Sequence, residues 1–485
     1  MAQRYYIYCV MKSTVILLLV FLSVKARGQT EFPITRFGAK STMNFDNANA
    51  IQRAIDSATL KGGTVMIPAG MYLTSPLQLK SNVTLHLDKD AILFGSTERM
   101  HYSGPALIVC KGQQNVGITG EGMIDGQGRE LVENTIQCLR EGKIQDEEWL
   151  KKRPTEKNRP NLLYFENCTG VRIKGVTLKN AACWVQNYKE CTHVVIDGIN
   201  VESTAYWNND GVDIVDSKDV VIKNSYFNAA DDAICLKSET AARTCEDVTV
   251  ENCTLRSSAN GFKLGTGSLG GFKNIVVKNI TVFDTYRSAI ALEAVDGGFI
   301  ENVHISGVNA TNTGNALFIR LGKRNTDDRY STVNNIVIEK VKAEIPAGKP
   351  DIGYPQEGPL PKMPIQYVLP MVIAGLPGHP VKNVQLMDIE VVYQGERVKG
   401  AINEVPDNPA GYPEFTMFGD LPAWGLYVMH ADSIQMWNFK VDVRRGDSRS
   451  ALMFEDVKAI LLRHVKVPEK KEMNTSHIEA KMLSF

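Results

Sequence analysis

A short motif of alternating apolar and polar residues recurs along most of this chain and limits the folds that it can adopt. Examples are NVTLHL from Asn82, GVRIKGV from Gly170, DVVIKNS from Asp219 and NIVVKNI from Asn274. Successive copies begin at residues 193, 219, 247, 274, 302 and 335, so neighbouring starts lie 26 to 33 residues apart. Within each copy β-branched residues occupy every second position, which predicts a short strand bounded by Gly, Asn and Asp turns.

Each copy resembles the next one. This favours stacked coils with strands in the same direction over a sandwich or barrel, in which neighbouring strands alternate in direction. Stacked coils bury their inward residues against the coils above and below. We therefore predict an all-β fold, a right-handed single-stranded parallel β-helix. A propeller is the alternative, but the chain lacks a repeated blade signature. Residues 46–63, DNANAIQRAIDSATLKGG, carry one apolar helical face and are expected to cap the first coil.

Three segments rich in Pro, Gly or charge interrupt the repeat, namely residues 126–160, 344–382 and 394–426. Repeat units flank each of them, so we expect loops that project from one β-helix domain rather than linkers between domains. Loops of this length in a compact domain are often functional. We expect them to form walls of a groove.

The first residues have the features of an export signal. In MKSTVILLLVFLSVKARG, residues 11–28, a lysine precedes an apolar run and small residues follow it. The run is too short for a comfortable membrane span. We expect cleavage of residues 1–28, a better start at Met11 than at Met1, and a secreted or periplasmic domain from 29 to 485. Most of the cysteines after this segment are predicted to be free and buried, since several lie in strand patterns.

The charge balance gives no sign of a nucleic-acid or anionic-membrane partner, although a few cations could still bind a polyanionic substrate locally. The 54 basic and 54 acidic residues cancel, and no long charged run occurs. No Cys/His cluster has zinc-ligand spacing. We expect no nucleic-acid partner, no membrane span, no metal and a monomeric protein.

Two acidic sequences, Asn209-Asp210-Gly211 and Asp231-Asp232, lie one repeat apart. Aligning the inward apolar residues puts Asp210 and Asp232 at the same turn of neighbouring coils, about 4.8 Å apart. Such crowding raises the pKa of at least one carboxyl group. Solvated Asp-Gly turns are the simpler explanation for any single residue, but the set of three fits the acid/base pair of a glycosidase.

Asn-x-Asp-Gly followed one coil later by Asp-Asp, behind an export signal, resembles the polygalacturonases and rhamnogalacturonan hydrolases of glycoside hydrolase family 28. The similarity runs from TRFGAKSTMNFDNANAIQRAID through the last coils. It implies a pectin-lyase-like solenoid that hydrolyses α-glycosidic bonds of pectin-like polysaccharides or oligosaccharides with inversion and without a metal or cofactor. Carried over to this chain, Asp231 is the general acid, while Asp210 and Asp232 position and deprotonate water.

The sequence departs from the family where a galacturonate carboxylate is normally bound. Asn260 stands where the family has the His of Gly-His-Gly, and Ala291 and Glu293 replace the cations of Arg-Ile-Lys. Glutamate repels a uronate, so plain polygalacturonase activity is not expected. The further candidates for substrate binding are Asn209, Asn260, Lys263, Arg287, Glu293, Lys237, Arg320 and Trp207. Trp184 and Trp424 are candidates for either sugar stacking or core packing.

Two other functions fit the same fold. A polysaccharide lyase would use the three aspartates as a Ca²⁺ site, and chelator sensitivity would reveal it. A non-catalytic carbohydrate-binding β-helix would keep its behaviour after Asp231→Asn.

Overall fold

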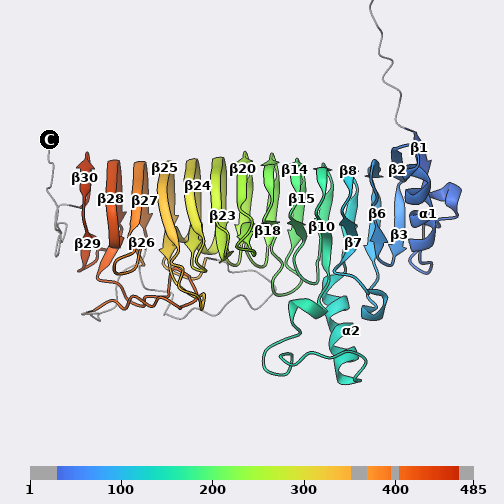
Figure 1. Ribbon diagram of the computed structural model, residues 1–485, viewed down its shortest axis with the longest axis horizontal. Coiled ribbons are helices and arrows are strands. Elements are labelled where there is room, and N and C mark those ends of the chain that lie inside the picture. The colour runs from blue at the N-terminus through green and yellow to red at the C-terminus, as the bar shows by residue number, and fades with distance from the viewer. Residues whose placement is uncertain (1–29, 351–368, 395–403, 469–485) are drawn as a thin grey trace, which may run out of the picture.

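The computed structural model describes residues 30–350, 369–394 and 404–468 as a long stack of parallel coils (Figure 1). Neighbouring coils pair through parallel strands throughout, and the predicted right-handed parallel β-helix is confirmed. The predicted export signal, residues 1–28 with the alternative start Met11, lies outside the described residues. So do residues 351–368 and 395–403 of the predicted loops.

A coil consists of three short strands, and equivalent strands of successive coils form three parallel sheets. The first sheet contains β4 (Leu77–Gln78), β7 (Ala106–Lys111), β10 (Asn161–Glu166), β13 (Gln186–Lys189), β16 (Val212–Val215), β19 (Ile234–Ser238) and β22 (Phe262–Ser268). The second contains β2 (Gly63–Ile67), β5 (Val83–Leu87), β8 (Gln114–Gly120), β11 (Thr169–Lys174), β14 (Thr192–Asp197), β17 (Lys218–Lys223) and β20 (Cys245–Glu251), with β1 (Glu31–Pro33) beside β2. The third contains β3 (Gly70–Thr74), β6 (Ala91–Gly95), β9 (Met123–Asp125), β12 (Thr177–Lys179), β15 (Asn200–Ser203), β18 (Tyr226–Ala229) and β21 (Thr254–Ser257).

Later coils continue the same sheets with longer strands that bend at the corners. These are β23 (Phe272–Ala294), β24 (Phe299–Leu321), β25 (Thr332–Ile345), β26 (Met371–Ala374), β27 (Val381–Tyr393), β28 (Ala423–Val443), β29 (Ser450–Val457) and β30 (Ile460–Arg463). The first sheet therefore runs on through the ends of β23 and β24, then β26, the start of β28, and β29.

The first residue of each repeat makes a local bend within the second sheet. Asn274, Asn302 and Asn335 have φ values of 56°, 57° and 58°, and asparagine tolerates this left-handed conformation better than most residues. Their side chains also form a ladder, since Asn302 donates to Asn274 at 3.2 Å and Asn335 donates to Asn302 at 2.8 Å. The left-handed bend thus explains why asparagine and aspartate are common at the repeat starts.

The inward residues form one continuous apolar column. Val220 pairs with Val248, Val248 with Ile275, and Ile275 with Val303, and all four are buried. The predicted cap is confirmed, because α1 (Ala48–Thr59) covers the first coil with a buried apolar face. Without this cap the open end of the column would expose apolar surface to water.

The predicted loops contain more regular structure than expected. Segment 126–160 carries α2 (Gly128–Arg140), which buries Leu131 and Val132, and a short 3-10 helix, η3 (Glu156–Asn158). Two further 3-10 helices, η1 (Ile34–Phe37) and η2 (Arg99–His101), lie nearer the N-terminus. Few apolar residues mark α2 among its many polar ones, so its helical pattern is weak in the sequence.

The other two predicted loops also overlap strands. The end of β25 and all of β26 lie inside 344–382, and β28 begins inside 394–426. Between these strands, residues 404–420 pack on the outside of the β-helix. There Phe415 and Phe418 join Phe318 and Val372 in a second apolar core. Proline and glycine on both sides hide such short strands from pattern analysis.

All eight cysteines in the described part of the chain are free and buried, as predicted. Among the helices that the structure describes, none is long and apolar enough to cross a membrane.

Candidate active site

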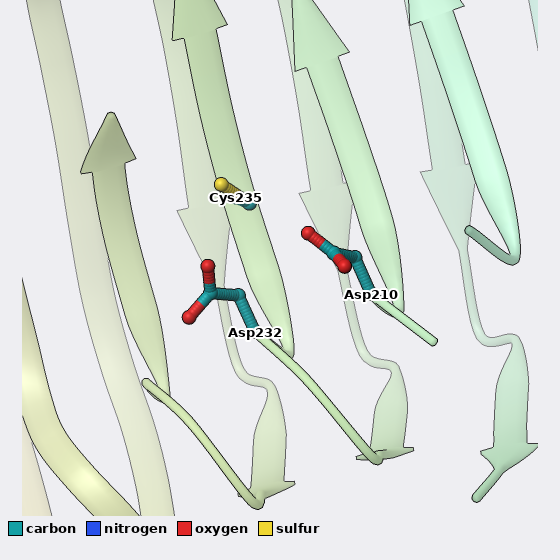
Figure 2. A group of neighbouring side chains, drawn as sticks. All are labelled: Asp210, Asp232 and Cys235. Carbon is teal, nitrogen blue, oxygen red and sulfur yellow. The ribbon is translucent and has the colours of Figure 1, made fainter. Parts of the chain in front are cut away.

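Asp210 and Asp232 lie at equivalent turns of neighbouring coils, immediately before β16 and β19 (Figure 2). Val212 pairs with Ile234, and Gly211 N donates to Asp232 O at 2.9 Å. A carboxylate oxygen of each aspartate and Cys235 Sγ lie within 4.8 Å of one another. The predicted neighbourhood of the two carboxyl groups is therefore confirmed.

Asp231 is the half-buried member of the acidic group. Its Oδ1 accepts a hydrogen bond from Asp232 N at 3.0 Å, and its Oδ2 accepts one from Asn208 Nδ2 at 3.3 Å. Burial, followed by the charge of Asp232, raises the pKa of Asp231 above its ordinary value. This carboxyl group can therefore hold a proton at a higher pH than an exposed aspartate does.

Asp232 has the opposite electrostatic environment. Its Oδ1 accepts hydrogen bonds from Asn260 Nδ2 at 2.7 Å and Asn260 N at 3.0 Å, and its Oδ2 lies 3.0 Å from Lys263 Nζ. Burial favours the protonated form, but the cations Lys263, Lys237 and Arg287 outweigh it and lower the pKa of Asp232 to about 2. Asp232 is a permanent carboxylate at the pH values where proteins function.

Asp210 shares a buried cation with a fourth acid that the sequence analysis missed. Lys237 Nζ lies 3.1 Å from Asp210 Oδ2 and also forms an ion pair with Asp213. Burial and the charge of Asp213 raise the pKa of Asp210, with Lys237 opposing them. The pKa of Asp213 rises to about 6, again through burial, against the charge of Lys237. Within the described part of the chain, Asp210 Oδ1 has no hydrogen-bond partner.

A signal for Asp213 was present in the repeat. It lies between the inward residues Val212 and Ile214, and its register partner Cys235 pairs in turn with Lys263. The substrate-binding candidate Lys263 lies on this same row, and Asp213 lies two coils before it.

On the C-terminal side of the aspartates, the charged groups neutralise one another. Lys263 Nζ lies 3.7 Å from Glu293 Oε2, and Thr266 Oγ1 donates to the same oxygen at 3.3 Å. Burial raises the pKa of Glu293 to about 7, although Lys263 opposes the shift. Arg287 lies two coils beyond Asp231 on the same row, next to Ala259, whose O accepts a hydrogen bond from Arg287 N at 2.7 Å.

Segment 404–420 covers this side with two residues that no repeat pattern could identify. Glu414 Oε2 lies 3.4 Å from Arg287 Nη2. The Tyr412 ring lies 5.5 Å from the Arg287 guanidinium and 5.9 Å from Lys263 Nζ. Two of the four cations that were predicted to bind substrate, Lys263 and Arg287, are thus already engaged by this segment and by Asp232.

Several residues that were predicted to contact the substrate have structural roles instead. Asn209 is fully buried, with its amide donating to Ala181 O and Cys183 O, so its prediction as a substrate contact is wrong. Arg320 is 1% exposed and donates to Gly375 O, Asp407 O and Asn408 O, which anchors segment 404–420. That prediction is wrong for the same reason. Asn260 is buried and positions Asp232.

The three candidate tryptophans also divide between the core and positions near the aspartates. Trp424 is 2% exposed and packs edge-on against Tyr393, so it belongs to the core. Trp184 and Trp207 are half-buried near the aspartates. Lys237 Nζ lies 4.5 Å from the Trp184 ring, and the Arg153 guanidinium lies 4.7 Å from the Trp207 ring.

Asp210, Asp232 and Cys235 have the spacing of metal ligands but do not fit Ca²⁺. Ammonium groups of Lys237 and Lys263 lie 3.1 and 3.0 Å from the two carboxylates. Calcium needs six to eight oxygen ligands, whereas this group supplies a sulfur and two carboxylates that lysines already neutralise.

The fold and this carboxyl group define the chain as a right-handed parallel β-helix protein with an acidic site of the glycosidase kind. Residues 58–345 match the family described as glycosyl hydrolases family 28, and the chain belongs to that family. The family resemblance found in the sequence is confirmed.

Similar proteins have pectin-related names. An exopolygalacturonase of Zea mays is 27% identical over 267 residues, covering 48% of this chain and 61% of the maize protein. An exo-poly-alpha-D-galacturonosidase of Dickeya chrysanthemi is 25% identical over 317 residues, covering 55% of this chain and 52% of its own length. The chain thus spans little more than half of these relatives.

Among solved structures, a hyperthermoactive exopolygalacturonase of Thermotoga maritima matches 88% of this chain and 94% of its own, with a TM-score of 0.62 at 20% identity. This likeness establishes the shared fold alone.

Proposed function

We propose that the protein is an exported glycosidase that cleaves α-glycosidic bonds in pectin-like polysaccharides or oligosaccharides, of galacturonan or rhamnogalacturonan type, by inverting acid/base hydrolysis. The observation that carries the proposal is the split in acidity among three adjoining carboxyl groups. The pKa of Asp231 is raised, whereas that of Asp232 is lowered to about 2. Neighbouring carboxyl groups whose pKa values shift in opposite directions are suited to the roles of proton donor and proton acceptor.

In this mechanism Asp231 gives its proton to the glycosidic oxygen as the bond to the anomeric carbon breaks. Asp210, whose Oδ2 lies 3.1 Å from Lys237 Nζ, accepts a proton from the attacking water. Asp232 stays ionised, orients the water and stabilises the positive charge that develops on the sugar. One proton leaves the enzyme and one returns to it, so the charge of the site is balanced after each turnover.

The substrate class rests on family membership and on the names of the relatives. Export rests on the apolar segment within residues 11–28. Glu293 and the neutralised cations argue against a galacturonate at the position where the family normally clamps it. A pectic chain that contains neutral sugars therefore fits better than plain polygalacturonate.

The test is incubation of the wild type and Asp231→Asn with homogalacturonan, rhamnogalacturonan-type and xylogalacturonan oligosaccharides, with and without chelator. We expect new reducing ends from the wild type alone, no unsaturated product and no effect of chelator. Proton NMR of the first product should show the inverted anomer. Unsaturated product that disappears with chelator would establish a lyase instead. Binding without turnover by both proteins would establish a carbohydrate-binding role.

A further inference from the structure

A groove of about 320 Å³ lies on the N-terminal side of the catalytic aspartates. Its walls come from Arg99, from the end of segment 126–160, and from Trp184. Figure 1 shows segment 126–160, with α2, projecting beside β7 and β10, from the same edge of the β-helix as the loop near β26. Since Val185 N donates to Asp210 O at 2.9 Å, Trp184 lies one coil before the catalytic group.

The groove is basic, and one of its cations is available. Arg99, Lys157 and Arg159 line it, and Glu156 is the single acid in the lining. That acid is engaged, because Glu156 Oε1 lies 3.2 Å from Arg159 Nη2. Lys157 is exposed and forms no hydrogen bond or ion pair within the described ranges.

The basic wall is connected to the catalytic acid through one amide. Asn208 Oδ1 accepts hydrogen bonds from Arg159 Nη2 at 2.7 Å and Arg153 Nη2 at 3.1 Å. The Nδ2 of the same residue donates to Asp231 Oδ2 at 3.3 Å. A ligand group held by Lys157 would share the groove with Arg159, whose Nη2 donates to this amide, and with the aromatic surface of Trp184.

The opposite side has the reverse character. There Lys263 and Arg287 face three carboxylates, those of Asp232, Glu293 and Glu414. Both cations are buried and paired. A sugar on this side encounters hydrogen-bonding groups but no available positive charge, and a uronate would meet the carboxyl group of Glu293.

We infer that the substrate is chemically asymmetric across the cleaved bond: a uronate lies in the groove beside Lys157 and Trp184, and a neutral sugar lies against Glu293 and Tyr412. Because it names the substrate of the same site, this inference rests on the proposed function. The substrate class is an oligosaccharide or polysaccharide in which acidic and neutral residues alternate or adjoin.

The first test compares hydrolysis of an alternating uronate–neutral oligosaccharide with that of a uronate homo-oligomer of equal length. We expect the wild type to have the higher kcat/KM on the alternating substrate. Lys157→Met should raise KM on it about two- to fivefold, as expected for one exposed ion pair. Lys151→Met is the matched control, because Lys151 is an exposed lysine of the same segment that pairs with Glu148 outside the groove.

Glu293→Gln tests the other side. This variant should improve kcat/KM on the uronate homo-oligomer by relieving charge repulsion, and Lys157→Met should not. Equal wild-type rates on both substrates, together with unchanged KM in Lys157→Met, would overturn the inference while leaving the glycosidase assignment intact.

A separate binding measurement keeps the two proposals distinguishable. Calorimetry with the alternating oligosaccharide and the uronate homo-oligomer needs no turnover. If the wild type hydrolyses neither, the proposed function fails; binding weakened by Lys157→Met but not by Lys151→Met would still support the groove as a uronate site. Equal binding by these two variants would overturn it.

Discussion

The cations on the two sides of the candidate aspartates, one in segment 126–160 and two beside segment 404–420, have very different surroundings. On the N-terminal side, Lys157 is exposed and unengaged within the described residues. On the C-terminal side, Lys263 and Arg287 are held by Asp232, Glu293 and Glu414. Counting cations in the sequence therefore misjudges which side attracts an acidic sugar. Availability depends on the partners that the fold places around each cation.

The largest expected effect concerns the centre between these two sides. Asp231→Asn should reduce kcat about 10²- to 10⁴-fold, the usual range for a general acid. Because the pKa of Asp231 is raised in the folded protein, its ionised form opposes folding, and that penalty grows as pH rises above the unfolded value. The variant should therefore be at least as stable as the wild type at neutral pH.

Initial rates and urea unfolding of Asp231→Asn check both expectations. If the variant kept more than a tenth of the wild-type rate, Asp231 would not be the general acid. The two sides would then not flank a catalytic centre at Asp231.

The next effect separates a cation inside the site from one at its surface. Lys263→Met removes the buried partner of Asp232 and Glu293 and should cost about 3–5 kcal/mol of unfolding free energy. Lys157→Met should change it by less than about 0.5 kcal/mol. Urea unfolding of the two variants at pH 7 measures the difference. Similar losses in both would show that the contrast between the two sides is not one of burial.

A pH series probes the C-terminal side through Glu293, whose pKa is raised to about 7. Its folded state holds the proton more tightly than the unfolded chain, so its contribution to stability falls as pH rises from about 4.5 through 7. Above pH 7 the carboxylate should repel a uronate, and KM for a uronate homo-oligomer should rise several-fold. In Glu293→Gln this rise should be absent, and steady-state kinetics from pH 5 to 8 test it. A rise of the same size in the variant would assign the effect to another group.

The smallest expected effect is the dependence of KM on salt concentration. Raising ionic strength from about 0.01 to 1 M shortens the screening length from about 30 to 3 Å, which weakens exposed charge pairs far more than buried ones. KM for the alternating oligosaccharide should rise about two- to threefold in the wild type and much less in Lys157→Met. An equal rise in the two proteins would place the salt-sensitive contact elsewhere.

The repeat predicted the coils and the proximity of Asp210 and Asp232 because each coil has nearly the same length and stacks in register. Asp210, Asp232 and Asn260 could be placed at one turn by aligning inward residues alone, and Asn260 N does bond to Asp232 Oδ1. The same alignment contained Asp213, which was overlooked rather than hidden. Helix α2 and strand β26 were missed because polar or proline-rich surroundings mask their short apolar patterns.

What the sequence determined by itself, therefore, is the β-helix, its capping helix, the row of aspartates and the family. All of these follow from local periodicity and from motifs within neighbouring repeats. Only the tertiary structure showed that Arg320 anchors a segment and that Glu414 pairs with Arg287. It alone also showed that Asn208 connects the basic groove to Asp231. These contacts join side chains through irregular segments whose paths follow no repeat, so no alignment of coils can place them, and they decide which charges remain available to a substrate.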